Sequence, residues 1–285
     1  MTHRGIVLGV GAPNRTRDGS KTMCAIVLTE DLGFIRIYPI PAETKFPIWS
    51  NVVVAVEKTS SDNRSESYKL KYFEVHDRIE DREQKRDILE SCVLRSGCDD
   101  PIDYCNARRS SIALVKIPPN TLGIAMSPRS PALKVMSDDE EYSWVLSQDQ
   151  HWQKPYLDWA SDQGKPHNTH LVGREVYMGL QKNPERPLAV YENLGITVPD
   201  YEHWLLLGNM KDRRNVWVGV HLHRQKKQIG GSIPLFSVTR NGKPDAWPYC
   251  KQETSNVAVV DNQQMLFTTE AMTSTNFRGN TAMIA

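Results

Sequence analysis

The chain has 285 residues, a length that fits one large domain or two small ones. Lysine and arginine number 35 and aspartate and glutamate 34, so a protein that coats nucleic acid with its whole surface is excluded. The five cysteines are scattered, which favours reduced thiols over a disulfide framework. The sequence lacks both a signal-peptide pattern and the roughly 18 apolar residues of a spanning helix, so we expect a cytoplasmic protein without a membrane partner.

The first third of the chain is patterned as short strands. Apolar or alternating runs are separated by polar connectors that are rich in glycine, serine and aspartate. Five such strands with hairpin spacing predict a small barrel or sandwich. The predicted strands are residues 5–10, 23–29, 34–40, 51–56 and 68–75.

The rest of the chain mixes helical and strand patterns. One helix is predicted within residues 77–96, where a partial apolar stripe runs between opposite charges. Residues 152–170 are polar, contain Lys-Pro twice, and are predicted to form a loop. Further strands are predicted at residues 110–117, 203–207 and 216–223, further helices at 172–181 and 187–194, and a hairpin between 233–239 and 257–260.

Three segments resemble a family of uncharacterised bacterial proteins that are described as carrying a dual OB domain. They are residues 33–41 (GFIRIYPIP), 50–70 (SNVVVAVEKTSSDNRSESYKL) and 205–224 (LLLGNMKDRRNVWVGVHLHR). In that family the final strand is rich in aromatic residues, where this chain has Val-His-Leu-His. The resemblance implies no catalytic activity, no cofactor and a place among prokaryotic antiviral defence and mobile-element genes.

The resemblance also implies a fold. It predicts a β-rich α+β protein with two OB-like small β-barrels joined by helical segments. The residue pattern, and not the resemblance, adds a C-terminal hairpin and tail extension. The first OB-like barrel with its C-terminal helix is expected over residues 1–117. The second, with a helical insertion, is expected over residues 118–228, and the hairpin extension with a loosely ordered tail over residues 229–285.

Basic residues gather between Asn209 and Gln228, where six cations accompany the single anion Asp212. OB barrels bind single strands with aromatic side chains that stack on bases and with cations that contact phosphates. A solvated cationic loop is the alternative interpretation. The predicted nucleic-acid-binding residues in this segment are Lys211, Arg213, Arg214, Arg224, Lys226 and Lys227, with Trp217 as a stacking side chain.

The first barrel offers a second group of candidates. Arg36 and Tyr38 share one face of a predicted strand, although either side chain can equally serve core packing. Lys58 and Arg64 flank a polar loop that ends at Tyr68. Two further arginines, Arg108 and Arg109, precede the strand at residues 110–117.

Catalytic and metal-binding patterns are weak. His221 and His223 point to one side of a strand and His203 lies on the preceding one, but no Asp, Glu or Cys nearby completes a zinc site. Cys92, Cys98 and Cys105 are more widely spaced than zinc-knuckle pairs. The acidic run at residues 138–141 is typical of a solvated turn.

The sequence therefore predicts a non-enzymatic protein that binds nucleic acid, preferentially single-stranded DNA or RNA. The alternative is a protein-interaction adaptor that docks on a nuclease or helicase partner, because a fold does not fix a function. A third hypothesis is a metal-dependent enzyme centred on His203, His221 and His223.

Overall fold

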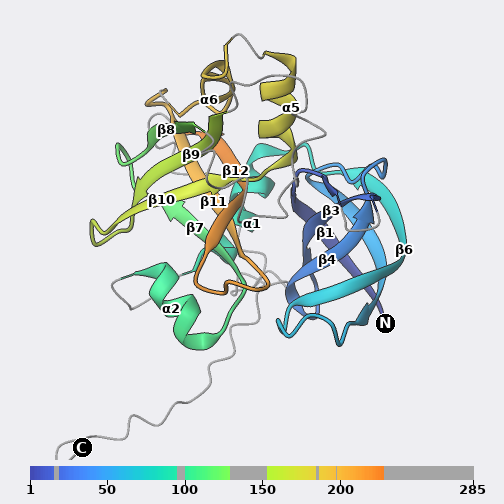
Figure 1. The fold of residues 1–285 in the computed structure, drawn as a ribbon. Helices are drawn as coiled ribbons and strands as arrows, with labels where there is room; N and C mark the ends of the chain where they lie inside the picture. Colours follow the sequence, from blue (N-terminus) through green and yellow to red (C-terminus); the bar gives the residue numbers. More distant parts are fainter. Residues whose placement is uncertain (16–18, 95–99, 129–152, 184–185, 197, 228–285) are drawn as a thin grey trace, which may run out of the picture. The chain divides into compact units, whose positions relative to one another are not determined.

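Two β-sheets of six strands each dominate the structure, which is a computed structural model. It describes residues 1–15, 19–94, 100–128, 153–183, 186–196 and 198–227. Figure 1 shows the first sheet in blue to cyan as a strongly curled ribbon, and the second in green to orange with α5 and α6 at one end. The predicted β-rich class is confirmed, whereas the predicted C-terminal hairpin and tail lie outside the described residues.

The first sheet closes into a ring because β1 pairs on both of its edges. Its first half pairs antiparallel with β5 and its second half with β3, giving the order β1-β5-β6-β4-β3-β1, with β4 and β6 parallel. Gly5 lies where β1 changes partner, and a Cβ there would be 2.5 Å from the Leu28 carbonyl oxygen. The strands are β1 (Thr2–Val10), β2 (Asn14–Arg15), β3 (Lys21–Thr29), β4 (Gly33–Pro41), β5 (Ser50–Lys58) and β6 (Ser67–Arg78).

The second sheet repeats this order with one interruption. Its order is β7-β11-β12-β10-β9-β8, and β10 and β12 form its parallel pair. When β7 and β8 are taken as the two halves of one broken strand, they pair with the same neighbours as the two halves of β1. The strands are β7 (Ile112–Ile117), β8 (Gly123–Pro128), β9 (Gln153–Ala160), β10 (Pro166–Leu171), β11 (Tyr201–Asn209) and β12 (Trp217–Lys226).

Four helices connect these strands in the described part of the chain. Aspartates begin the first two, since Asp81 accepts from the Gln84 amide and Asp100 from the amides of Ile102 and Asp103. None of the helices in the described ranges is long and apolar enough to cross a membrane. The helices are α1 (Arg82–Cys92), α2 (Pro101–Arg108), α5 (Arg174–Lys182) and α6 (Ala189–Asn193).

Most predicted elements are confirmed, but the loop predicted at residues 152–170 is wrong. This stretch forms β9 and β10, and its inward side chains Leu157 and Trp159 are buried. Proline has no amide N–H to donate, but Pro155 lies beyond the end of β10 and pairs only with β8. Pro166 is tolerated because it is the first residue of β10. The predicted domain boundaries stay predictions, although β7, at the end of the predicted first unit, pairs with β11 of the second sheet.

Three apolar cores stabilise the described part. One fills the ring and one lies inside the second sheet. The third joins the two sheets, where Ile6 and Leu8 of β1 and Ile26 of β3 pack with Trp204 and Leu206 of β11. Helix α1 adds Ile88 and Leu89 to this shared core. Because β1 and β3 bury side chains on both faces, their sequences are apolar runs without alternation.

Candidate nucleic-acid interface

Arg36 is buried between the two sheets and not exposed to solvent, as a phosphate contact would require. Its side chain is 5 % exposed, and Nη2 donates to the Ser111 carbonyl oxygen at 2.8 Å while Nη1 donates to Ser111 Oγ at 3.4 Å. Burial, together with the charge of Arg64, lowers the pKa of Arg36 to about 10. The interpretation of Arg36 as a nucleic-acid contact does not fit this position, because the residue joins β4 to the start of β7.

Two further arginines join the loops of the two sheets. Arg64 Nη1 donates to the Asn209 carbonyl oxygen at 2.7 Å, and Arg214 Nη2 donates to the Asn63 carbonyl oxygen at 3.3 Å. The loop between β5 and β6 and the turn between β11 and β12 therefore exchange hydrogen bonds in both directions. Each turn supplies one arginine and one carbonyl group.

Arg64 is fixed by a second interaction. Its Nε and Nη2 donate to the two carboxylate oxygens of Asp62 at 2.9 and 2.5 Å. Burial acts to raise the pKa of Asp62, but the hydrogen bonds and charge of Arg64 lower it to about 2. The donors of Arg64 are thus engaged within the protein, so this arginine shapes the loop and is not free to hold a phosphate.

These loops enclose a polar pocket of about 420 Å³. Its lining comes from three segments far apart in the sequence: the β5–β6 loop, the turn between α2 and β7, and the β11–β12 turn. None of the described residues that line it carries a carboxylate. We call it the arginine–asparagine pocket, and it is lined by Asn63, Arg64, Asn106, Arg109, Ser110, Asn209, Arg214 and Asn215.

Arg109 is the most accessible cation of this pocket. It follows the last residue of α2 in the left-handed conformation, with φ 58°, and it is exposed. Within the described part of the chain its guanidinium makes no hydrogen bond or ion pair. Lys211 and Arg213 are exposed on the adjacent β11–β12 turn, and Arg108 is exposed with its guanidinium 4.6 Å from the centre of the Tyr104 ring. Of these four predicted cations Arg109 lines the pocket itself, and the other three are exposed on neighbouring positions of the same segments.

The conformation of Arg109 yields a prediction. A left-handed backbone costs a non-glycine residue about 1 kcal/mol, and glycine is the usual residue at this end of a helix. Arg109→Gly is therefore expected to raise the free energy of unfolding by about 0.5 to 1 kcal/mol. Urea unfolding of the variant and the wild type would check this. A variant that is destabilised contradicts the prediction.

Trp217 does not occupy the position predicted for it. Its side chain is 8 % exposed and packs in the core of the second sheet, and its Nε1 donates to Asn106 Oδ1 at 3.0 Å. The first residue of β12 faces inward, so the ring cannot stack on a base at the surface. Trp217 instead fixes the orientation of the Asn106 amide beside the pocket.

The basic segment between residues 209 and 228 divides into two groups. Lys211, Arg213 and Arg214 lie before β12, whereas Arg224, Lys226 and Lys227 lie at or just beyond its far end. An extended strand rises about 3.3 Å per residue, so the two groups are roughly 20 to 30 Å apart. Arg224 bonds to the Asn193 carbonyl oxygen and lies over the Tyr201 ring. The predicted single basic surface is therefore not formed.

The remaining candidates of the first sheet have mixed positions. Tyr38 is 40 % exposed on β4 and its hydroxyl accepts from Thr22 Oγ1 at 3.4 Å. Lys58 donates to the carbonyl oxygens of Arg64 and Ser65 and lies 4.4 Å from the centre of the Tyr68 ring. Lys58 and the half-buried Tyr68 thus hold the β5–β6 loop in shape.

The three candidate histidines lie on two different faces of the β11–β12 pair. His203 is opposite Arg224 in the register, whereas His223 is opposite Trp204. The His221 ring contacts the carboxylate of Glu175 of α5, and the His223 ring lies 5.0 Å from the Trp49 ring. Among the described residues no three His, Cys, Asp or Glu side chains form a group that could hold a metal ion.

The cysteine and acidic hypotheses are only partly covered by the structure. Cys92 and Cys105 are buried in two different cores, and burial raises the pKa of the Cys105 thiol to about 12. Cys98 and the acidic run at residues 138–141 lie outside the described residues. The described cysteines are thus separate core residues and do not share a site.

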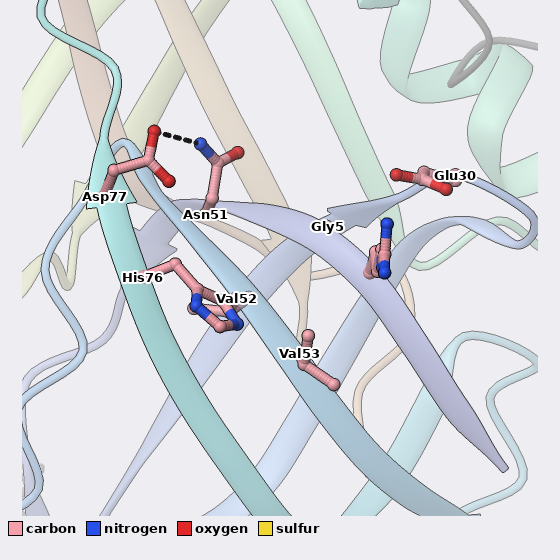
Figure 2. A pocket seen from close by; sticks show the side chains of 8 residues that line it. Gly5, Glu30, Asn51, Val52, Val53, His76 and Asp77 are labelled. Atoms are coloured by element: carbon pink, nitrogen blue, oxygen red, sulfur yellow. Dashed lines mark hydrogen bonds between the residues drawn. The ribbon is translucent and has the colours of Figure 1, made fainter.

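A second hollow of about 360 Å³ lies beside strands of the first ring (Figure 2). Most of its lining comes from β1, β5 and β6, and Asn51 Nδ2 donates to Asp77 Oδ2 at 3.2 Å at one edge of it. Arg4 lines this hollow together with two carboxylate residues, Glu30 and Asp77. Because carboxylates repel phosphates, this hollow suits a polyanion less well than the arginine–asparagine pocket does.

The asparagines of the pocket were missed by the sequence analysis, although a signal for them exists. Each of the three segments places an asparagine within three residues of an arginine, as in Asn63-Arg64 and Arg214-Asn215. Asparagine is common in turns for conformational reasons, so the pattern carries little weight until the fold brings the segments together. Only the tertiary structure separates these asparagines from ordinary turn residues.

A known family model covers the N-terminal part of the chain. Residues 1–91 match a domain of unknown function, DUF8758, and this range contains the whole first sheet and most of α1. No curated protein matches the chain. The match is not described as an OB domain or as bacterial, so the dual OB resemblance stays a prediction.

Proposed function

We propose that this protein binds single-stranded nucleic acid at the arginine–asparagine pocket. One observation carries the proposal: Arg109 and Arg214, two predicted cations from separate segments, line a single pocket whose described lining has no carboxylate, while Arg64 is held by Asp62 and shapes the loop. Arg108, Lys211 and Arg213 are exposed on neighbouring positions of the same two segments. Phosphate groups are the anions that such clustered guanidinium groups bind best.

We further propose that both sheets are OB-like barrels. The closed strand order, the parallel pair and the position of α5 and α6 between β10 and β11 support this interpretation. In OB folds the loop between the fourth and fifth strands contributes to oligonucleotide binding. The β5–β6 loop and the β11–β12 turn occupy this position in the two sheets, and both line the arginine–asparagine pocket.

The shared core favours the loops over a sheet face as the binding site in the first ring. Ile26 and Leu28 of β3 and Ile6 of β1 are buried against the second sheet. Arg36 on β4 is buried in the same contact. An oligonucleotide cannot reach these strand faces, whereas the pocket at the loops stays open to it.

The asparagine side chains favour a single strand over a duplex. An amide offers both a donor and an acceptor, which suits the edges of bases. These edges are accessible when the bases are unpaired. We therefore expect single-stranded DNA or RNA to bind more tightly than duplex DNA of the same length.

Fluorescence anisotropy with labelled single strands of 12 nucleotides, titrated with the protein, tests the proposal. Binding is expected to weaken steeply with salt, with a slope of log K against log salt of about −0.7 for each phosphate contacted. The double variant Arg109→Gln/Arg214→Gln is expected to bind at least about tenfold more weakly, with a slope shallower by about 1.

A matched variant makes this test specific. Arg224→Gln/Lys226→Gln removes the same charge from the other end of β12 and is expected to bind as the wild type does. Equal losses in the two double variants would show that net charge and not the pocket determines binding. Absence of wild-type binding at 50 mM salt would overturn the proposed function.

A further inference from the structure

Asn209, the last residue of β11, has an unsatisfied polar atom beside the arginine–asparagine pocket. The residue is 7 % exposed and lines the pocket. Its backbone is fully engaged, since its amide donates to the Ser111 carbonyl oxygen at 3.0 Å and its carbonyl oxygen accepts from Arg64. Its side-chain Oδ1, however, is buried without a hydrogen-bond partner in the described part of the chain. Buried polar atoms in folded proteins rarely stay unpaired.

Asn106 supplies the complementary group. Its Oδ1 accepts from Trp217 Nε1 at 3.0 Å, and an indole N–H can only donate, so the orientation of this amide is determined. The NH₂ group of Asn106 is therefore the part of the amide left to serve a ligand. Together, Asn106 and Asn209 provide one donor and one acceptor in a pocket that Arg109 and Arg214 make positive.

A donor and an acceptor that line one pocket can meet the Watson–Crick edge of an unpaired base. A volume of about 420 Å³ lies in the range of pockets that take one small organic group. The last side-chain torsion of asparagine is broad, so the Asn209 amide can turn to meet such a base.

We infer that the arginine–asparagine pocket receives one unpaired nucleobase, which hydrogen-bonds to Asn209 and Asn106 while Arg109 and Arg214 contact the neighbouring phosphates. This inference rests on the proposed function and makes it more specific. The proposed function alone needs only the charge of the strand, whereas the inference requires the base itself to contribute to affinity.

The test compares two strands of equal charge. One is a labelled 12-residue deoxythymidine strand, and the other is a 12-residue strand of abasic tetrahydrofuran units with the same phosphates. The wild type is expected to bind the strand with bases about tenfold more tightly, at the same salt concentration. Asn209→Ala is expected to reduce this preference to about twofold or less, with an unchanged salt slope.

Two controls keep the result interpretable. Asn51→Ala removes an asparagine from the hollow in Figure 2 and is expected to keep the full preference. Asn209→Ala is expected to stay folded at the assay temperature, because Oδ1 makes no hydrogen bond in the described residues that the substitution would remove. A melting curve checks this, and a variant that is unfolded at that temperature would contradict the unpaired state of Oδ1 on which the inference rests.

The outcomes separate the inference from the proposed function. Equal, salt-sensitive binding of both strands to the wild type would overturn the base pocket and leave the proposed function intact. A full preference retained by Asn209→Ala would likewise overturn the role of Asn209. Failure of both strands to bind the wild type would overturn the proposed function and the inference together.

Discussion

Replacing Arg36 by alanine is expected to lower the free energy of unfolding by about 3 kcal/mol. The guanidinium is almost completely buried and supplies hydrogen bonds to both the carbonyl oxygen and the hydroxyl of Ser111. Alanine would remove one of the two hydrogen bonds of that carbonyl, which keeps the Asn209 amide as a donor, and would open a cavity between the sheets. The guanidinium packs closely against β11, because a Cβ added to Gly208 would lie 2.8 Å from Arg36 Nη2.

Urea unfolding followed by tryptophan fluorescence measures this loss. Lys69→Ala is the matched control, since it removes an exposed cation from β6 of the same ring and is expected to change stability by less than about 0.5 kcal/mol. Similar stabilities for Arg36→Ala and Lys69→Ala would show that Arg36 does not join the two sheets. A pronounced loss in the Arg36 variant alone supports the contact described for it.

Acidification is expected to destabilise the protein as the pH falls below about 6.5. Burial, together with the neighbouring His221, lowers the pKa of His223 well below its ordinary value. Burial also lowers the pKa of His203, where the Leu194 carbonyl group acts in the opposite direction. Above pH 6.5 both histidines are uncharged in the folded and in the unfolded protein, so neither makes the stability depend on pH. Below it the unfolded chain binds protons that the folded chain does not, and stability falls.

The size of this effect follows from proton counting. Each histidine that stays neutral in the folded state lowers the free energy of unfolding by up to about 1.4 kcal/mol per pH unit, so two give up to about 2.8 kcal/mol per unit. Unfolding midpoints at pH 7.5, 6.5 and 5.5 measure the slope. His223→Phe is expected to lower this slope by the contribution of one histidine. A stability that is flat from pH 7.5 to 5.5 would contradict the burial of both histidines.

Apolar runs and alternating patterns in the sequence were sufficient to predict the strands of the first ring. The runs at β1 and β3 are apolar without interruption, because both faces of these strands are buried. Closure of the ring could not be predicted from pattern alone, since it depends on β1 changing partner near Gly5. The repeat of the strand order in the second sheet is invisible in the sequence because the loop between β7 and β8 interrupts the strand equivalent to β1.

The strands β9 and β10 show where sequence patterns fail. Their outward residues are polar and their prolines suggest a loop, yet alternate residues such as Leu157 and Trp159 are fully or almost fully buried. Pro155 lies beyond the end of β10 and Pro166 is the first residue of β10, so the positions of both prolines depend on where this neighbouring strand begins and ends. Local sequence does not contain that information.

The candidate site was predicted in part. Arg109 and Arg214 were predicted to contact nucleic acid, which stays a prediction, and the sequence could not show that they meet at one pocket. Arg36 and Trp217 were assigned to the surface because charged and aromatic side chains often lie there, whereas tertiary contacts bury both. Cations at the far end of β12 were grouped with the others because proximity in sequence does not imply proximity along an extended strand.

Photochemical crosslinking tests the central claim most directly. A single strand that contains 4-thiouridine would be crosslinked to the wild-type protein at low salt, digested, and mapped by mass spectrometry. We predict crosslinks in the three segments that line the arginine–asparagine pocket, residues 59–66, 104–111 and 209–217. Crosslinks confined to other segments, such as the hollow beside Arg4 and Asp77 or the far end of β12 at Arg224, would contradict the account.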